Sequence, residues 1–218
     1  LPGAFALDSV ISGLRNWKIW EKLPAGVRAR LSALEGKNLR KGMDPALRQR
    51  VFHVSVGDGL KAAEAGLRKA RELGYAASLA DQPLQWEARM EGTMLGKQLK
   101  ALAPGQALLS LGETTVALKG AGRGGRNQEL ALSAALELAG TQGVVLLSAG
   151  TDGVDGTSDA AGAVVTGNTC AKKADAEAAK KALENNDSHA FFLDRPERLV
   201  TGPTGTNVAD LVVAVRGG

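Results

Sequence analysis

Residues 114–148 read TTVALKGAGRGGRNQELALSAALELAGTQGVVLLS. The first six of these residues predict a β-strand, and residues 143–148 predict a second, strongly apolar strand. Between them, residues 127–139 repeat apolar side chains along one helical face. A glycine-rich loop over residues 120–126 joins the first strand to this helix. A strand, a helix of more than ten residues and a second strand in this order indicate an α/β fold.

The same alternation extends in both directions along the chain. We expect an α/β fold with a mixed, mostly parallel sheet and helices packed on it. Residues 6–35 read as helices, so a helical lead-in precedes the sheet. We therefore divide the chain into a helical connector, residues 1–48, and an α/β domain, residues 49–218. Further expected strands are 51–56, 75–79, 107–111 and 211–215, and further expected helices are 60–73, 86–102 and 174–185.

Composition narrows the class of protein. The 28 glycines in 218 residues are about twice the usual share, and they gather in a few loops where backbone must approach something closely. Cys170 is the single cysteine, so no disulfide can form within the chain and a cytoplasmic location is expected. No apolar run approaches the ~20 residues of a membrane span. The net charge of +4 comes from scattered basic residues with few aromatic side chains, which argues against nucleic acid as a partner.

The first loop with chemical potential is the glycine-rich segment at residues 120–126. Gly120, Gly122 and Gly125 fit the pattern G-x-G-x-x-G between a predicted strand and a predicted helix. Such a loop lets backbone N–H groups and a helix N-terminus meet a phosphate. Arg123 and Arg126 add forked donors that suit phosphate or carboxylate. The alternative is a tight turn with two solvent-facing arginines.

The second loop follows the strand that ends at Ser148 and contains Asp152, Asp155 and Asp159. It leaves the carboxyl end of a buried strand, which is the edge where α/β sheets bind ligands. Asp152 and Asp155 are the candidate Mg²⁺ ligands, with water and phosphate completing the shell. The alternative is that the aspartates form turns or cap a helix.

Two further segments offer polar groups. Residues 201–207, TGPTGTN, carry hydroxyls and free N–H groups that suit an anion or a sugar acid, or else form a capping turn. Glu113 joins two predicted strands and either orients an arginine or is a surface charge. His53 is expected to be a structural histidine and His189 to lie at the surface. Cys170 has no histidine nearby in sequence, so it is not expected to be a nucleophile, and no P-loop motif occurs.

Three motifs together resemble the C-terminal domain of the class II glycerate 2-kinases, the MOFRL family, whose members have often been labelled hydroxypyruvate reductases. They are residues 122–131, GRGGRNQELA, residues 150–156, GTDGVDG, and residues 201–207. The resemblance is dense from about residue 107 to 215 and looser from 17 to 104. Where the family usually has Pro-Thr, this chain has Thr157-Ser158.

The resemblance implies transfer of the γ-phosphoryl group of ATP to the 2-hydroxyl of D-glycerate, with a divalent metal such as Mg²⁺. Family members are about twice as long, so the missing N-terminal domain is an expected partner, and we predict little activity for residues 1–218 alone. A homodimer is also considered. Residue type, and not the resemblance, suggests the roles. Arg123, Arg126 and Asp152 are the candidate catalytic residues, and the candidate ligand-binding residues are Glu113, Gly122, Gly124, Gly125, Asn127, Thr151, Thr204, Thr206 and Asn207.

Two other functions stay open at this point. One is an NAD(P)H-dependent hydroxypyruvate reductase, in which the glycine-rich loop grips the pyrophosphate and Asp152 binds the ribose. The other is a non-catalytic domain that binds a small molecule. Calorimetry with ATP and with NADH separates the kinase from the reductase.

Overall fold

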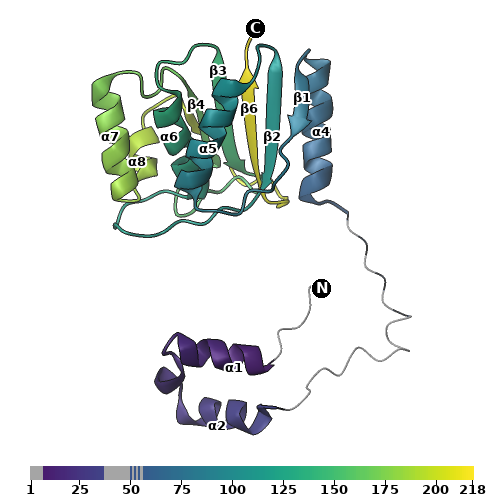
Figure 1. The fold of residues 1–218 in the computed structure, drawn as a ribbon, viewed down its shortest axis with the longest axis vertical. Helices are drawn as coiled ribbons and strands as arrows, with labels where there is room; N and C mark the ends of the chain where they lie inside the picture. The colour runs from purple at the N-terminus through teal and green to yellow at the C-terminus, as the bar shows by residue number, and fades with distance from the viewer. Residues whose placement is uncertain (1–6, 37–49, 51, 53, 55) are drawn as a thin grey trace. The chain divides into compact units, whose positions relative to one another are not determined.

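The structure is a computed structural model of the 218-residue chain. It divides into two compact units, residues 1–54 and 55–218, and each is described by itself (Figure 1). The boundary predicted after residue 48 and the predicted structural role of His53 lie outside the described residues. None of the helices that the structure describes is long and apolar enough to cross a membrane. The described residues are 7–36, 50, 52, 54 and 56–218.

The N-terminal unit consists of short helices, as the sequence predicts. They are α1 (Leu7–Asn16), the 3₁₀ helix η1 (Trp20–Lys22) and α2 (Ala25–Leu34). The Arg15 guanidinium donates from Nη1 and Nη2 to the two carboxylate oxygens of Glu35, at 2.7 and 3.0 Å. This forked ion pair joins α1 to the residue that follows α2, so the two helices form one hairpin-like unit.

A six-stranded sheet forms the centre of the second unit. Its order is β1-β2-β6-β3-β4-β5 (Figure 1). The β1–β2 pair is parallel, and the other four pairings are antiparallel. The expected mixed α/β sheet is therefore confirmed, but the expectation that it is mostly parallel is wrong. The strands are β1 (Ala76–Leu79), β2 (Gln106–Gly112), β3 (Val144–Gly150), β4 (Gly162–Thr166), β5 (Arg198–Leu199) and β6 (Asp210–Arg216).

The connection between β3 and β4 contains no helix, and this explains one of the antiparallel pairings. β3 and β4 are joined by the loop 151–161, so the chain reverses and β4 pairs antiparallel with β3. β6 then enters between β2 and β3 and runs opposite to both. The sequence analysis did not predict β4, whose five residues follow the glycine- and aspartate-rich loop without an alternating pattern.

The strand predicted over residues 114–119 does not form. β2 already has β1 on one side and β6 on the other, so the chain that leaves β2 finds no free edge beside it. At Gly112 the backbone has φ +143°, and a Cβ there would lie 2.2 Å from the Leu84 carbonyl oxygen. The segment then runs as a loop in which Leu118 is exposed. Of the predicted strand 51–56 the structure describes residues 52, 54 and 56, which are exposed and not in a strand.

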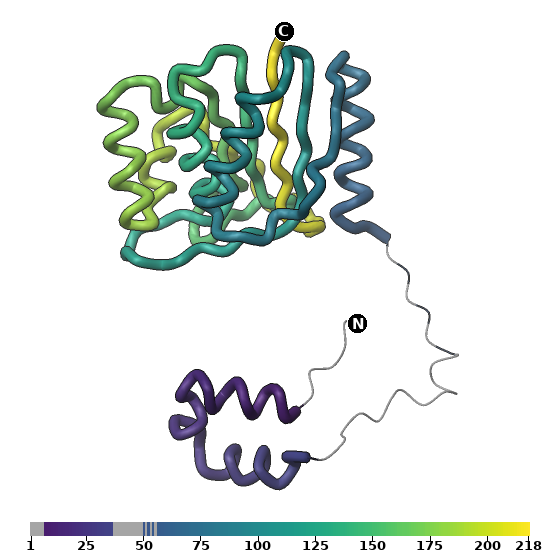
Figure 2. Tube along the Cα trace, in the orientation of Figure 1, coloured from purple at the N-terminus to yellow at the C-terminus, as the bar shows by residue number. Residues whose placement is uncertain are grey.

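Helices cover the sheet, as the sequence predicts. Figure 2 traces α4 beside the β1 edge of the sheet and α5 next to α6 at its centre. The core is formed by α5, α6, α7 and α8 against one sheet face, where Leu146, Val165 and Val212 are fully buried. Gly92 lets α5 meet α6 closely, because a Cβ there would lie 2.2 Å from the Leu130 carbonyl oxygen. The helices are α4 (Gly59–Glu72), α5 (Ala88–Ala101), α6 (Arg126–Leu138), α7 (Lys173–Glu184) and α8 (Ser188–Phe192).

Candidate functional site

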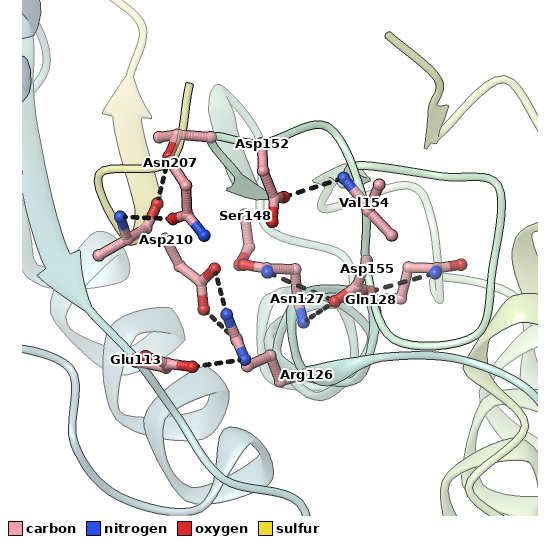
Figure 3. Close-up of polar contacts among 12 residues, drawn as sticks. Glu113, Arg126, Asn127, Gln128, Ser148, Asp152, Val154, Asp155, Asn207 and Asp210 are labelled. Atoms are coloured by element: carbon pink, nitrogen blue, oxygen red, sulfur yellow. Dashed lines mark hydrogen bonds and ion pairs between the residues drawn. The ribbon is translucent and has the colours of Figure 1, made fainter. Parts of the chain in front are cut away.

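The polar loops meet at one edge of the sheet. In the strand register, Gly112 of β2, Asp210 of β6 and Gly150 of β3 lie side by side. Because β6 runs opposite to its neighbours, the carboxyl ends of β2 and β3 face the amino end of β6. The segments that carry Glu113, residues 151–159 and residues 201–209 therefore begin or end at this edge, beside the N-terminus of α6 (Figure 3).

Arg126 is the centre of this cluster. It is the first residue of α6, and its guanidinium donates from Nε and Nη2 to the two carboxylate oxygens of Asp210, at 2.5 and 3.1 Å. Its Nη1 forms an ion pair with Glu113 at 2.8 Å. The Asp210 carboxylate is buried, so it fixes the arginine firmly, whereas the Glu113 side chain is 65% exposed. The hydrogen bonds to Asp210, helped by both negative charges, raise the pKa of Arg126, so it stays fully charged.

Asp210 was not among the predicted site residues. It directly precedes the predicted strand 211–215, 84 positions from Arg126, and no local pattern links the two. Its neighbour Ala209 has φ +81°, which is unusual for a residue with a side chain. The Asn207 side chain accepts a hydrogen bond from the Ala209 N–H at 3.2 Å and so supports this turn. This turn at Ala209 places the Asp210 carboxylate against Nε and Nη2 of Arg126.

Arg123 has partners different from those of Arg126. Its backbone N–H donates to Asp187 Oδ1 at 2.9 Å, and its Nη2 donates to the Thr157 carbonyl oxygen at 3.2 Å. Arg126 lines a pocket of about 440 Å³ together with Gly122, Gly124 and Gly125, and Arg123 is absent from the described residues that line it. The structure therefore places one of the two predicted arginines at the pocket.

The glycines of the loop are explained first by contacts within the chain. A Cβ at Gly122 would lie 2.4 Å from the Asp187 side chain, and one at Gly124 would lie 2.3 Å from the Ser188 hydroxyl. Several N–H groups of the loop are also engaged. Those of residues 119–123 donate to the side chains or backbone of Asn185, Asn186 and Asp187. These N–H groups are not free to bind a phosphate, so the expected backbone cradle is not formed by them.

Asp155 occupies the N-terminus of α6. Its Oδ1 accepts the Asn127 N–H at 2.9 Å and its Oδ2 accepts the Gln128 N–H at 2.8 Å. The side-chain amides of Asn127 and Gln128 donate to the same two oxygens at 3.4 and 3.1 Å. Burial raises the pKa of Asp155, and these four hydrogen bonds oppose the rise. A carboxylate with four N–H donors fits a helix cap, which was the alternative to the predicted metal ligand.

Asn127 forms part of the same buried network. The Ser148 hydroxyl donates to Asn127 Oδ1 at 2.7 Å, while the Asn127 amide nitrogen faces Asp155 (Figure 3). Asn127 is 2% exposed, so both ends of its side chain are used inside the fold. Its contacts therefore tie α6 to the end of β3, and its predicted role in binding a ligand stays a prediction.

Asp152 is the more accessible of the two predicted metal ligands. Its Oδ1 accepts the Val154 N–H at 3.0 Å, which closes the turn after β3 (Figure 3). Its Oδ2 accepts no hydrogen bond from the residues that the structure describes. Among those same residues, no cluster of three or more His, Cys, Asp or Glu side chains is arranged to hold a metal ion. Any ion at Asp152 would need ligands from a substrate, from water or from another segment.

The loop 201–209 is fastened to the loop that follows β3. The Thr204 hydroxyl donates to the Thr151 carbonyl oxygen at 2.5 Å, and the Val208 N–H donates to the Thr151 hydroxyl at 2.9 Å. The Thr206 N–H contacts the Thr204 hydroxyl at 3.4 Å. Gly153, at φ +86°, leaves room for this approach, because a Cβ would lie 2.0 Å from the Gly202 carbonyl oxygen. The predicted second and third loops are thus one structural unit beside Arg126.

An ion pair between α5 and α6 lies next to the pocket that Arg126 lines. Arg89 Nε donates to Glu129 Oε1 at 2.7 Å, and Glu129 Oε2 accepts from the Asn186 amide at 3.2 Å. Asn186 Oδ1 in turn accepts the N–H groups of Lys119 and Gly120. This chain of contacts runs from α5 through α6 to the glycine-rich loop, and the sequence analysis did not anticipate it.

Two other side chains with reactive groups, those of His189 and Cys170, lie outside the pocket that Arg126 lines. His189 is 5% exposed, so the prediction that it lies at the surface is wrong. Its backbone N–H donates to the Arg123 carbonyl oxygen, which draws α8 against the glycine-rich loop. Cys170 is also buried, and this burial is the main reason that the pKa of its thiol is raised to about 11. A neutral, buried thiol agrees with the expectation that Cys170 is not a nucleophile.

Comparison with known proteins places the α/β unit in a family. Residues 106–210 match the model of the MOFRL family, so the chain contains a MOFRL family domain. The D-glycerate 2-kinase of Thermotoga maritima is 44% identical over 168 residues, which cover 73% of this chain and 40% of that enzyme. The glycerate 2-kinase of Pyrococcus horikoshii is 33% identical over 214 residues, covering 93% of this chain and 48% of that enzyme.

A solved structure agrees with these sequence matches. The crystal structure of the Thermotoga maritima glycerate kinase superposes with a TM-score of 0.72 and 37% identity. The match covers 87% of this chain and 49% of that one. The chain therefore spans about half the length of the relatives that it matches, and the fold is shared over that part.

Proposed function

We propose that this chain supplies the C-terminal half of the active-site cleft of a glycerate 2-kinase. The reaction is transfer of the γ-phosphoryl group of ATP to the 2-hydroxyl of D-glycerate, and it takes place in the cytoplasm with Mg²⁺. The complete enzyme contains a further N-terminal domain. The MOFRL domain and the named activity of the relatives support this proposal. The observation that carries it is an arginine, Arg126, anchored by a buried carboxylate at the edge of a pocket.

A guanidinium offers two forked edges, and Arg126 uses them differently. The edge formed by Nε and Nη2 is held by Asp210. The edge formed by Nη1 and Nη2 meets only the exposed Glu113, through Nη1, among the described residues. A substrate carboxylate or a phosphoryl group fits this second edge as a forked acceptor once Glu113 moves aside. Arg126 would then position the substrate or stabilise the charge of the transferring group.

Asp152 is the residue that we propose for the metal or for the proton. One of its oxygens closes the turn after β3, and the other accepts no hydrogen bond from the described residues. Mg²⁺ commonly binds one or two carboxylates and takes the rest of its shell from water and phosphate, so a single aspartate fits. When bound, the ion would neutralise phosphate charge. Asp155 is proposed as the helix cap and not as a second ligand, because four N–H groups already meet its oxygens.

The reductase alternative is disfavoured by the same contacts. A dinucleotide fingerprint needs free N–H groups in its glycine-rich loop and an uncapped helix N-terminus for the pyrophosphate. Here the N–H groups of residues 119–123 bond within the chain, and a carboxylate stands at the start of α6. The Asp155 charge would repel a pyrophosphate at that position.

A direct assay tests the proposal. The complete enzyme, incubated with D-glycerate and MgATP, should form 2-phosphoglycerate, detected by phosphorus NMR. Hydroxypyruvate with NADH should show no protein-dependent loss of NADH absorbance. Oxidation of NADH without phosphorylation of glycerate would replace the kinase by the reductase.

A further inference from the structure

A second pocket lies away from the Arg126 cluster. It is a groove of about 600 Å³ between α5, the outer strands β1 and β2, and the loop that joins β1 to α5. We name it the β1 groove. Its wall includes Leu84, Trp86 and Met94, and its floor includes Leu108 and Ser110 of β2. Arg126 and the loop 151–161 are absent from its described lining, so it is distinct from the proposed active site.

The groove follows from how α5 packs. Gly92 and Gly96 bring α5 against α6, because a Cβ at either position would lie within 3 Å of that helix. On the opposite face of the sheet, α4 covers β1 and β2, where Gly66 meets the Leu109 side chain. The groove lies beside α5, on the face of β1 and β2 that α4 does not cover.

A buried hydroxyl points to a ligand in this groove. Ser110 is 2% exposed, and its Oγ has no hydrogen-bond partner among the described residues. A buried hydroxyl without a partner is unfavourable, and most such groups in proteins are satisfied. Ser110 lies within β2, so its position is fixed by pairing on both sides of the strand. A polar ligand atom in the groove would supply the missing hydrogen bond.

The other polar groups of the groove define the charge that it accepts. Glu91 is 6% exposed and accepts the N–H groups of Gln85 and Trp86 at 3.2 Å each, which holds the backbone of the tryptophan in place. Asp81 also lines the groove. No Lys, Arg or His belongs to its described lining. Two carboxylates without a cation disfavour phosphates and carboxylates, so the part of the ligand that contacts this groove is not anionic.

The apolar wall indicates a flat ring. Trp86 and Met94 are 55% and 45% exposed at the groove, and indole and thioether groups both make favourable contacts with an aromatic face. The Ser110 hydroxyl and the Gln98 amide offer donors and acceptors for the edge of such a ring. We propose that the β1 groove binds an uncharged nitrogen heterocycle of purine size. This proposal does not depend on the reaction at Arg126.

Adenosine is the probe that we choose, with ribose as the control that lacks the ring. Calorimetry on the 218-residue chain should detect adenosine binding and no ribose binding. Ser110→Ala should weaken adenosine binding at least threefold, and Met94→Glu should weaken it at least tenfold. Met90→Glu is the matched control, because Met90 is similarly exposed on α5 but is not among the groove residues. It should bind adenosine as the unchanged chain does.

Two results would overturn the proposal that the β1 groove binds a heterocycle. Absence of adenosine binding at millimolar concentration would overturn it, and so would binding that Ser110→Ala and Met94→Glu leave unchanged. In the complete enzyme, competition between adenosine and ATP would assign the groove to the base of the co-substrate. Binding without competition would assign it to a separate nucleoside. Because the kinase assay is measured independently, failure of the groove and failure of the proposed function are distinguishable.

Discussion

At the scale of single residues, the ion pair of Arg126 and Asp210 is the centre of the candidate site. The arginine was identifiable from the sequence, because a forked cation beside four glycines is unusual in a plain turn. Its partner was not, since the two residues are 84 positions apart and meet only through the β2–β6–β3 register. The sequence therefore indicated which residue holds the charge, and the sheet determined which edge of its guanidinium is held by Asp210 and which meets the exposed Glu113.

Replacement of Arg126 tests that assignment. In the complete enzyme, Arg126→Ala should lower kcat/KM for glycerate at least tenfold, which corresponds to about 1.4 kcal/mol of lost transition-state stabilisation. Arg126→Lys should restore part of the loss, because an ammonium cannot make a forked contact. Arg28 serves as a control, since it pairs only with Glu21 among the described residues of the N-terminal unit. Near-normal kinetics for Arg126→Ala would remove Arg126 from the site.

Glu113 gives a second test at the same scale. If its carboxylate occupies the edge of Arg126 that the substrate needs, Glu113→Gln should lower KM for glycerate several-fold and leave kcat nearly unchanged. The reason is that the neutral amide competes less well for the guanidinium than a carboxylate does. Steady-state kinetics at saturating ATP measure this. A fall in kcat would instead mean that Glu113 acts on the substrate directly.

At the scale of elements, the N-terminus of α6 shows what the glycine-rich motif can and cannot predict. The pattern G-x-G-x-x-G correctly placed a helix start after the loop, and α6 begins at Arg126. It did not show that the helix N-terminus already holds an anion, because Asp155 comes from the loop after β3. The alternation of strand and helix predicted most elements within a few residues. It missed β4, β5 and α8, and it wrongly placed a strand at 114–119, because free sheet edges cannot be seen in a sequence.

The capping role of Asp155 predicts a change in stability. Asp155→Ala removes the acceptors of two backbone N–H groups in a buried setting and should cost about 2 kcal/mol of unfolding free energy. For a domain of this size the melting temperature should fall by about 4–8 °C, measured by circular dichroism without added metal.

Asp159→Ala is the matched control for that measurement. Its side chain is 64% exposed and pairs with Arg198 at 3.2 Å, a contact worth little in water. The control should melt close to the unchanged chain. Equal melting temperatures for Asp155→Ala and the unchanged chain in the absence of metal would contradict the cap and revive Asp155 as a metal ligand.

At the scale of the whole molecule, the α/β unit forms one side of the proposed cleft. A single sheet edge brings together Arg126, Glu113, Asp152 and the loop 201–209. The described residues contain no group of three or more His, Cys, Asp or Glu side chains that could hold a metal ion. The relatives that match are about twice as long. A kinase needs a cradle for the nucleotide phosphates, and the N–H groups of the glycine-rich loop are mostly engaged within the chain.

We therefore expect the 218-residue chain alone to show little or no glycerate kinase activity, although it folds. The measurement is formation of 2-phosphoglycerate from D-glycerate and MgATP by the purified chain, first alone and then mixed with the N-terminal half of the Thermotoga maritima enzyme as a separate polypeptide. The added half should raise turnover if the two halves assemble, because positioning of the phosphates is what the chain lacks. Robust turnover by the chain alone would contradict this expectation. It would show that the edge at Arg126 holds both substrates unaided, so that the pocket beside the glycine-rich loop, and not a second domain, must receive the nucleotide.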